Sequence, residues 1–78
     1  METILLSPNP AQQTLMVEIP FKQTAQIRIV DINGKIILET RTNNSKTDLS
    51  ISNLASGVYQ LVIENGSKML RKKFVKVD

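Results

Sequence analysis

Acid–base or metal chemistry in this chain would have to rest on carboxylates, because its 78 residues include neither histidine nor cysteine. Histidine is the commonest metal ligand and a frequent general base, and cysteine supplies nucleophiles and soft metal ligands. The seven carboxylates are scattered, with no spacing that pairs them: Glu2, Glu18, Asp31, Glu39, Asp48, Glu64 and Asp78. The sequence therefore predicts no catalytic residue, no metal site and no cofactor, in a protein that is not an enzyme.

Positive charge is concentrated at the C-terminal end of the chain. Of ten Lys and Arg residues, five lie in the last eleven positions: Lys68, Arg71, Lys72, Lys73 and Lys76. Two interpretations are open: a strand that binds a partner, or a solvated edge strand whose lysines discourage aggregation between sheet edges. Nucleic-acid binding is disfavoured, because it needs aromatic side chains for base stacking and this run offers Phe74 alone.

The elements that position these charges show the two-residue period of β-strands. Leu15, Val17 and Ile19, for example, alternate with Thr14, Met16 and Glu18. The alternation and its breaks predict seven strands, at residues 3–6, 14–19, 25–32, 35–41, 47–52, 58–64 and 68–76. Alternation is lost at Val30, Ile32, 36–38 and 74–75, where bulges or central strands would explain apolar residues on both faces.

Two Asn-Gly pairs separate neighbouring strands. Asn33-Gly34 and Asn65-Gly66 each predict a hairpin, because both residue types tolerate the positive φ that tight hairpin turns require. Seven short strands with two hairpins predict an all-β fold, a compact immunoglobulin-like antiparallel β-sandwich forming one domain over residues 1–78. No apolar run reaches the length of a membrane span, so direct membrane insertion is not expected.

The stretch DLSISNLASGVYQLVI, residues 48–63, predicts two strands joined by a corner. Gly57 is expected to adopt a conformation that other residues resist, so that Val58 begins a new strand. Tyr59 is expected to tie the corner to nearby backbone through its hydroxyl. Near the N-terminus, Pro8-Asn9-Pro10 predicts either a stiff loop or a recognition turn.

Four segments, taken in order, resemble the C-terminal sorting domains of the type IX (Por) secretion system of Bacteroidetes. They are SPNP at 7–10 ahead of the strand TLMVEI, VDINGKII at 30–37, LSISNLASGVYQLVI at 49–63 and KKFVKV at 72–77. The resemblance covers nearly the whole chain. It departs from the common pattern at Ser7, where many members carry an aromatic residue, and at Asp78, which follows the terminal basic strand.

The resemblance implies a domain that ends a larger exported protein and directs it across the outer membrane. It also implies passage through the periplasm, recognition by the outer-membrane translocon and shuttle proteins of the system, and removal by a sortase-type surface peptidase. The cargo would then lie at the cell surface or outside the cell. The implied fold is the immunoglobulin-like sandwich that the strand pattern also predicts.

The resemblance also assigns roles to individual residues. The family motif falls on positions expected to be structural: Pro8, Asn9, Pro10, Asp31, Asn33, Gly34, Lys35, Leu54, Gly57, Val58 and Tyr59. The terminal strand, which the resemblance ties to export, contributes Lys72, Lys73, Val75 and Lys76. For these four residues the resemblance favours partner recognition. Because an edge strand offers unpaired backbone amides and carbonyls, we expect the partner to bind by adding a strand to the sheet.

The alternative is a small β-sandwich that binds carbohydrate or mediates adhesion at the end of a secreted enzyme. Carbohydrate binding benefits from exposed aromatic side chains, and the chain has three aromatics in all: Phe21, Tyr59 and Phe74. In either case, unpaired sheet edges leave weak self-association open.

Overall fold

A computed structural model describes residues 4–8, 12–19 and 24–77. It contains the seven predicted strands: β1 (Leu5–Ser7), β2 (Thr14–Glu18), β3 (Ala25–Val30), β4 (Ile36–Thr42), β5 (Lys46–Ser50), β6 (Gly57–Asn65) and β7 (Lys68–Lys76). The observed ends differ from the predicted ones by one or two residues in most cases. Within the described part of the chain, no helix has the length and apolar character needed to cross a membrane.

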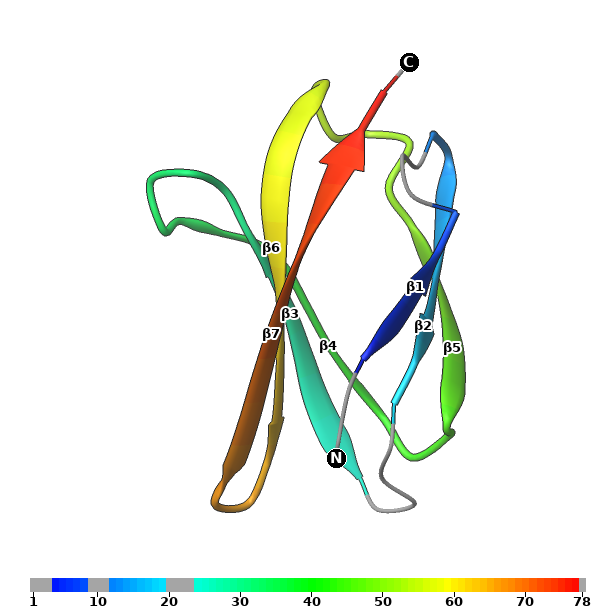
Figure 1. Ribbon diagram of the computed structural model, residues 1–78, viewed down its shortest axis with the longest axis vertical. Helices are drawn as coiled ribbons and strands as arrows, with labels where there is room; N and C mark the ends of the chain where they lie inside the picture. Colours follow the sequence, from blue (N-terminus) through cyan, green and yellow to red (C-terminus); the bar gives the residue numbers. More distant parts are fainter. Residues whose placement is uncertain (1–3, 9–11, 20–23, 78) are drawn as a thin grey trace.

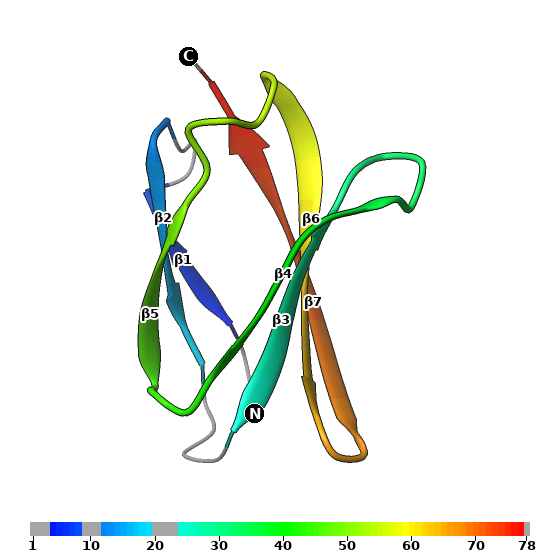
Figure 2. The same ribbon diagram turned by 180° about the vertical axis from the view of Figure 1, so that it is seen from behind.

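The strands form two antiparallel sheets that face each other (Figures 1 and 2). One sheet has the order β1-β2-β5 and the other the order β4-β3-β6-β7. If β1 to β7 are matched to strands A to G of an immunoglobulin domain, β4 has moved from the ABED sheet to the CFG sheet. The prediction of a compact immunoglobulin-like sandwich is confirmed.

The core lies between the sheets and is built by the alternating apolar residues. Leu15 and Val17 on β2 face Ile27 and Ile29 on β3, and all four are fully buried. Tyr59 and Phe74 are directly paired on β6 and β7, and their rings stack with centroids 5.7 Å apart. Because the strands of the two sheets do not pair with each other in the described residues, side-chain packing is the main contact between the layers.

The β3–β4 hairpin is confirmed, but its turn differs from the predicted two-residue Asn-Gly turn. The amide of Gly34 donates to Asp31 O, and the amide of Asp31 donates to Lys35 O, each at 3.0 Å. Gly34 has φ of +84°, whereas Asn33 has negative φ. The loop is thus a three-residue one in which a turn is followed by a glycine in the left-handed region. The Asp31 carboxylate stabilises this three-residue loop, because it accepts hydrogen bonds from the backbone amides of Asn33 and Lys35, each at 2.9 Å.

This geometry predicts a ranked response to substitutions at Gly34. An added Cβ would meet no atom within 4 Å, so any cost comes from the backbone alone. We expect Gly34→Ala to lower the free energy of unfolding by about 1–2 kcal/mol, and Gly34→Asn to lower it less, because asparagine tolerates positive φ better. Urea unfolding of the three proteins measures the order. Equal stability of the alanine and glycine proteins would contradict the turn described here.

The β6–β7 hairpin is also confirmed, with a shifted turn. Asn65 pairs with Lys68 as the last residue of β6, so Gly66 and Ser67 form the loop in place of Asn65 and Gly66. The glycine therefore occupies the first position of a two-residue loop. The sequence pair Asn-Gly located the hairpin correctly and misplaced its register by one residue.

Two different causes explain the positions where alternation fails. The register of β3 against β4 shifts between Ile29 and Val30, which confirms a bulge there. Ile32 and Ile36 lie in and beside the hairpin loop, and both are exposed to solvent. β4 is an edge strand, so the suggestion that its apolar run marks a central strand is wrong. The apolar residues at the start of β4 that break the alternation are instead exposed to solvent.

Candidate functional site

The four tail residues tied to export lie on β7, which forms one edge of the four-stranded sheet, as Figure 1 shows. Alternation along the strand divides them between its two faces. Lys72 and Lys76 share the inward side of Phe74, which is buried in the core. Lys73 and Val75 point to the outer face. The sequence treated these residues as one recognition element, and the structure separates them into two pairs.

The inward pair makes contacts within the domain. The Lys72 ammonium group donates to the carbonyl oxygen of Ile4 at 3.0 Å, which joins β7 to the residue that precedes β1. Lys76 is 4% exposed and pairs with Gly57 across the sheet. Both lysines lie at the seam between the sheets, where Lys76 is buried and Lys72 is exposed to solvent.

Lys73, one member of the outer pair, lines a pocket of about 320 Å³. The pocket lies between the β3–β4 loop and the neighbouring ends of β6 and β7. Figures 1 and 2 show that this loop projects from the body of the domain. The lining of the pocket comes from three separate segments: Asp31, Ile32, Gly34, Val58, Tyr59, Gln60 and Lys73. Five of these seven residues, all but Ile32 and Gln60, were singled out from the sequence, so the fold brings the motif segments to one place.

One acidic and one basic side chain, Asp31 and Lys73, line the pocket. The Asp31 carboxylate is held by two backbone amides of its own loop. Lys73 makes no side-chain hydrogen bond or ion pair with any described residue. Among the described residues, Lys73 thus lines the pocket without a side-chain partner, while one oxygen of the Asp31 carboxylate, Oδ1, accepts the two turn amides.

Sequence reasoning missed Ile32, which is 82% exposed at the tip of the loop. Large aliphatic residues are rarely placed in such a turn, where Asn, Asp, Gly and Pro predominate. The signal was present as a break in alternation, and it was interpreted as a feature of the sheet. An isoleucine between Asp31 and Asn33 is better explained as an apolar side chain exposed on the surface.

The corner before β6 has the predicted structure. The Tyr59 hydroxyl donates to the carbonyl oxygen of Ala55 at 2.6 Å, as in the tyrosine corner of immunoglobulin-like domains. Gly57 has φ of +156°, at the limit of what other residues adopt, and Leu54 packs against the core. These three residues fix the path by which the chain crosses from one sheet to the other.

We expect Tyr59→Phe to lower the free energy of unfolding by about 0.5–1.5 kcal/mol, because Ala55 O loses its donor while the ring remains packed. In a domain of this size the melting temperature should fall by about 4–8 °C per kcal/mol. Thermal unfolding followed by circular dichroism measures the change. An unchanged melting temperature would mean that water replaces the hydroxyl at no cost.

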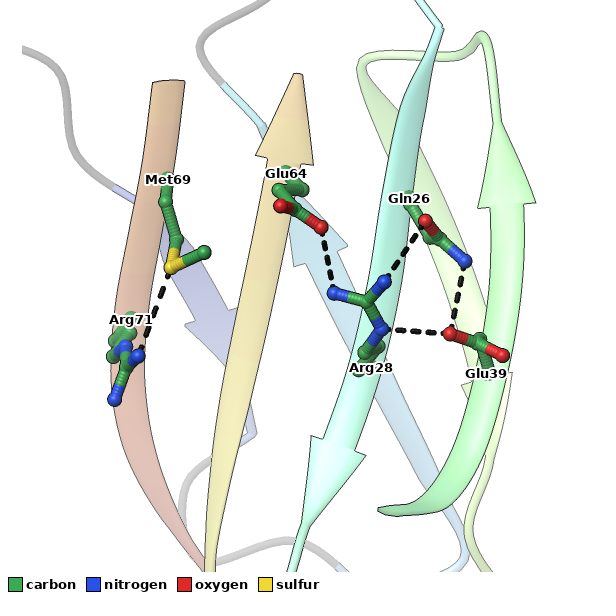
Figure 3. Close-up of polar contacts among 6 residues, drawn as sticks. All are labelled: Gln26, Arg28, Glu39, Glu64, Met69 and Arg71. Atoms are coloured by element: carbon green, nitrogen blue, oxygen red, sulfur yellow. Dashed lines mark hydrogen bonds and ion pairs between the residues drawn. The ribbon is translucent and has the colours of Figure 1, made fainter. Parts of the chain in front are cut away.

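The rest of the outer face carries a polar network (Figure 3). The Arg28 guanidinium contacts Glu39 and Glu64 at 2.6 Å each, and Gln26 completes the cluster. The hydrogen bond with Glu39, followed by that with Glu64, raises the pKa of Arg28 above its ordinary value, so its charge is permanent. The network joins β3, β4 and β6, and each of the three nitrogens of the Arg28 guanidinium donates one hydrogen bond within it.

The N-terminal motif is described only in part. Pro8 is exposed after a cis Ser7–Pro8 peptide bond, and it lines a shallow hollow with Thr14 and Val77. Asn9 and Pro10 lie outside the described residues. The described Asp and Glu residues do not gather into a group of three that would suit a metal ion.

Comparison with known proteins gives three results. The family described as "Secretion system C-terminal sorting domain" matches residues 6–77. A funoran endo-beta-hydrolase of Wenyingzhuangia aestuarii is 32% identical over 77 residues, which are 95% of this chain and 10% of that enzyme. The solved structure of PorZ, described as an essential bacterial surface component of the type-IX secretion system of Porphyromonas gingivalis, superposes with a TM-score of 0.81 at 16% identity. That match covers 96% of this chain and 11% of PorZ, and at this identity it shows the fold alone.

Proposed function

Because this chain belongs to the secretion system C-terminal sorting domain family, we propose that it carries an attached cargo out of the cell by presenting one end of its four-stranded sheet to the type IX machinery. A domain of this family is a sorting signal, which directs a secreted protein to the cell surface or the extracellular space. The cargo and its activity belong to other parts of the protein. The chain spans about a tenth of the enzyme it resembles, so that enzyme's activity is not transferred to it.

The observation that carries the proposal is the family match over 6–77, together with the convergence of its motif segments on one pocket. The β3–β4 loop, the start of β6 and the end of β7 are far apart in the sequence. A purely structural motif has no need to expose a pocket beside an uncommitted lysine. A recognition domain needs an exposed pocket of this kind, because its partner must bind to a surface.

The proposed route has three steps. The exported protein reaches the periplasm, where the folded domain of residues 1–78 is recognised by the translocon and shuttle proteins of the outer membrane. One of these partner proteins adds a strand of its own to the sheet edge at β7, and the lysines of β7 orient the encounter. A sortase-type peptidase then removes the domain. In the described residues β7 pairs with β6 alone, which is consistent with an edge open to such addition.

An export assay tests the sorting role. Residues 1–78 are fused behind a fluorescent protein that carries a periplasmic signal, in a bacterium with a type IX system. We expect fluorescence at the surface or in the medium, and its loss when the secretion genes are deleted. The same fluorescent protein without the domain is the control for leakage.

Retention of the intact, folded fusion in the periplasm would contradict the proposal. Its folding is verified by resistance to protease after lysis. A pull-down of the purified chain on insoluble polysaccharides would then test the carbohydrate-binding alternative directly.

A further inference from the structure

Exposed apolar side chains gather at one end of the outer face of the four-stranded sheet. Ile32 is 82% exposed, Ile36 50%, Val58 45% and Val75 40%. The register places them together, since Val58 pairs with Val75 on β7 and Ile36 pairs with Val30, which lies opposite Gln60 on β6. The other end of this face is covered by the Arg28 network (Figure 3). The four apolar side chains define the apolar end of the face.

An apolar end of this kind is unlike the scattered apolar residues of an ordinary surface. Contiguous exposed apolar patches on small soluble domains mark interaction sites. Here the patch also encloses a pocket, because Ile32 and Val58 belong to its lining. At about 320 Å³ the pocket has room for one or two large side chains and lies at the lower end of the range for ligand sites.

The size of the apolar end argues against a second copy of the chain as its occupant. A stable protein–protein interface takes roughly 20–30 residues from each side. The apolar end and the pocket together involve far fewer, so they fit a short segment of a partner.

The charges at the pocket define the chemistry of that segment. Lys73 has no side-chain partner among the described residues, and the amides of Asn33 and Lys35 both donate to Oδ1 of the Asp31 carboxylate. Lys35 itself is exposed on the same loop. Lys73 and Lys35 outnumber the single carboxylate of Asp31 here, so a basic segment would be disfavoured, whereas a carboxylate beside an apolar side chain would find a cation beside an apolar wall.

We propose that the pocket between the β3–β4 loop and the β6–β7 ends docks an extended, acidic-apolar segment of a secretion-system protein. The inference rests on the proposed sorting function and assigns its recognition to Ile32, Val58 and Lys73. It takes Lys72 and Lys76 out of direct recognition. Docking on this face leaves the hydrogen-bonding edge of β7 available for strand addition by the same partner.

Binding is measured first with defined peptides, on the purified 78-residue chain labelled with ¹⁵N. One probe is a capped peptide of about eight residues, the length of a short strand, that alternates valine with glutamate. The matched probe alternates valine with lysine. We expect the acidic peptide, at up to a few millimolar, to shift the amide resonances of Ile32, Val58 and Lys73 and to leave those of β2 and β5 unchanged.

Surface variants then test the same residues. The double variant Ile32→Thr with Val58→Thr changes two exposed residues of the pocket lining. The matched control, Leu5→Thr with Met69→Thr, changes two exposed apolar residues that do not line the pocket. Lys73→Gln is matched by Lys68→Gln at the opposite end of β7. We expect the pocket variants to weaken peptide binding roughly tenfold, and the matched variants to change it by less than about twofold. Circular dichroism verifies that each variant is folded.

The export assay separates this inference from the sorting role. Export of the parent fusion together with unchanged export of the folded pocket variants would overturn the docking site and leave the sorting role intact. Failure of the parent fusion to be exported would contradict the sorting role, and the peptide experiment would still decide the site. Equal shifts with both peptides, or none, would overturn it.

Discussion

Phe74→Ala should lower the free energy of unfolding by about 3–5 kcal/mol, the largest single effect we expect in this chain. Phe74 is fully buried on β7 and its ring stacks on Tyr59 across the strand pair. Truncation removes both the apolar contacts of the ring and its aromatic partner, and the sheets cannot close over the cavity without moving β7. A chain of this length has roughly 4–12 kcal/mol of stability in all, so the substitution removes a large part of it.

Urea unfolding at equilibrium measures this change, with Phe74→Leu and Met69→Ala alongside. Leucine keeps most of the volume and should cost about 1–2 kcal/mol, because the ring contact is lost while the core stays filled. Met69 lies on the same strand and is half-exposed, so its truncation should change stability by less than about 0.5 kcal/mol. A loss of under 1 kcal/mol for Phe74→Ala would mean that β7 is not packed as described.

Sequence reasoning reached the fold because the core follows the strand period. Leu15, Val17, Ile27 and Ile29 alternate in the sequence, and the same residues are buried in the structure. The Tyr59 corner was equally accessible, since a tyrosine that follows a glycine break has few other uses for its hydroxyl. The register of the two turns could not be predicted from the sequence, because an Asn-Gly pair fits several kinds of hairpin loop. The hydrogen bonds that the Asp31 carboxylate accepts from the amides of Asn33 and Lys35 favour one of these loops.

The site was predicted in its parts and not in its arrangement. The resemblance marked Asp31, Gly34, Val58, Tyr59 and Lys73, all of which line one pocket. It also grouped Lys72 and Lys76 with Lys73. Alternation along β7 was enough to place them on the opposite face, once Phe74 was assigned to the core. What alternation cannot supply is the position of the β3–β4 loop over β6, because that depends on the bulge at Val30.

Ile32 shows why exposed apolar residues are easily misread. A break in alternation has two meanings, a buried second face or an exposed apolar contact, and the sequence alone does not separate them. Burial of the outer face of β4 would need a further layer packed on it, and the described residues form two sheets that already cover each other's inner faces. Counting the strands available to cover each face would have favoured the exposed contact.

Leu15→Ala should lower the free energy of unfolding by about 2–5 kcal/mol, and its effect should be felt in both sheets. Leu15 is fully buried on β2 and pairs with Leu49 within the three-stranded sheet. Among the described residues, side-chain packing and a few bonds such as that between Thr42 and Thr47 connect this sheet to the other. If the two sheets are one cooperative unit, a cavity on β2 must destabilise the strands around Tyr59 by the same amount.

The chain provides its own local probe for this test, since Tyr59 is the single tyrosine and there is no tryptophan. Tyrosine fluorescence reports on the four-stranded sheet, and far-ultraviolet circular dichroism reports on both sheets. We expect the two urea transitions of Leu15→Ala to coincide and to shift together from those of the parent chain, whereas Leu5→Ala, at a half-exposed position of the same sheet, should leave both in place. A fluorescence transition that stays at the parent midpoint while the dichroism signal splits would show that the four-stranded sheet folds without its partner. The pocket proposed as the docking site is lined by β6, β7 and the β3–β4 loop, so such a result would also define the smallest part of the chain able to carry it.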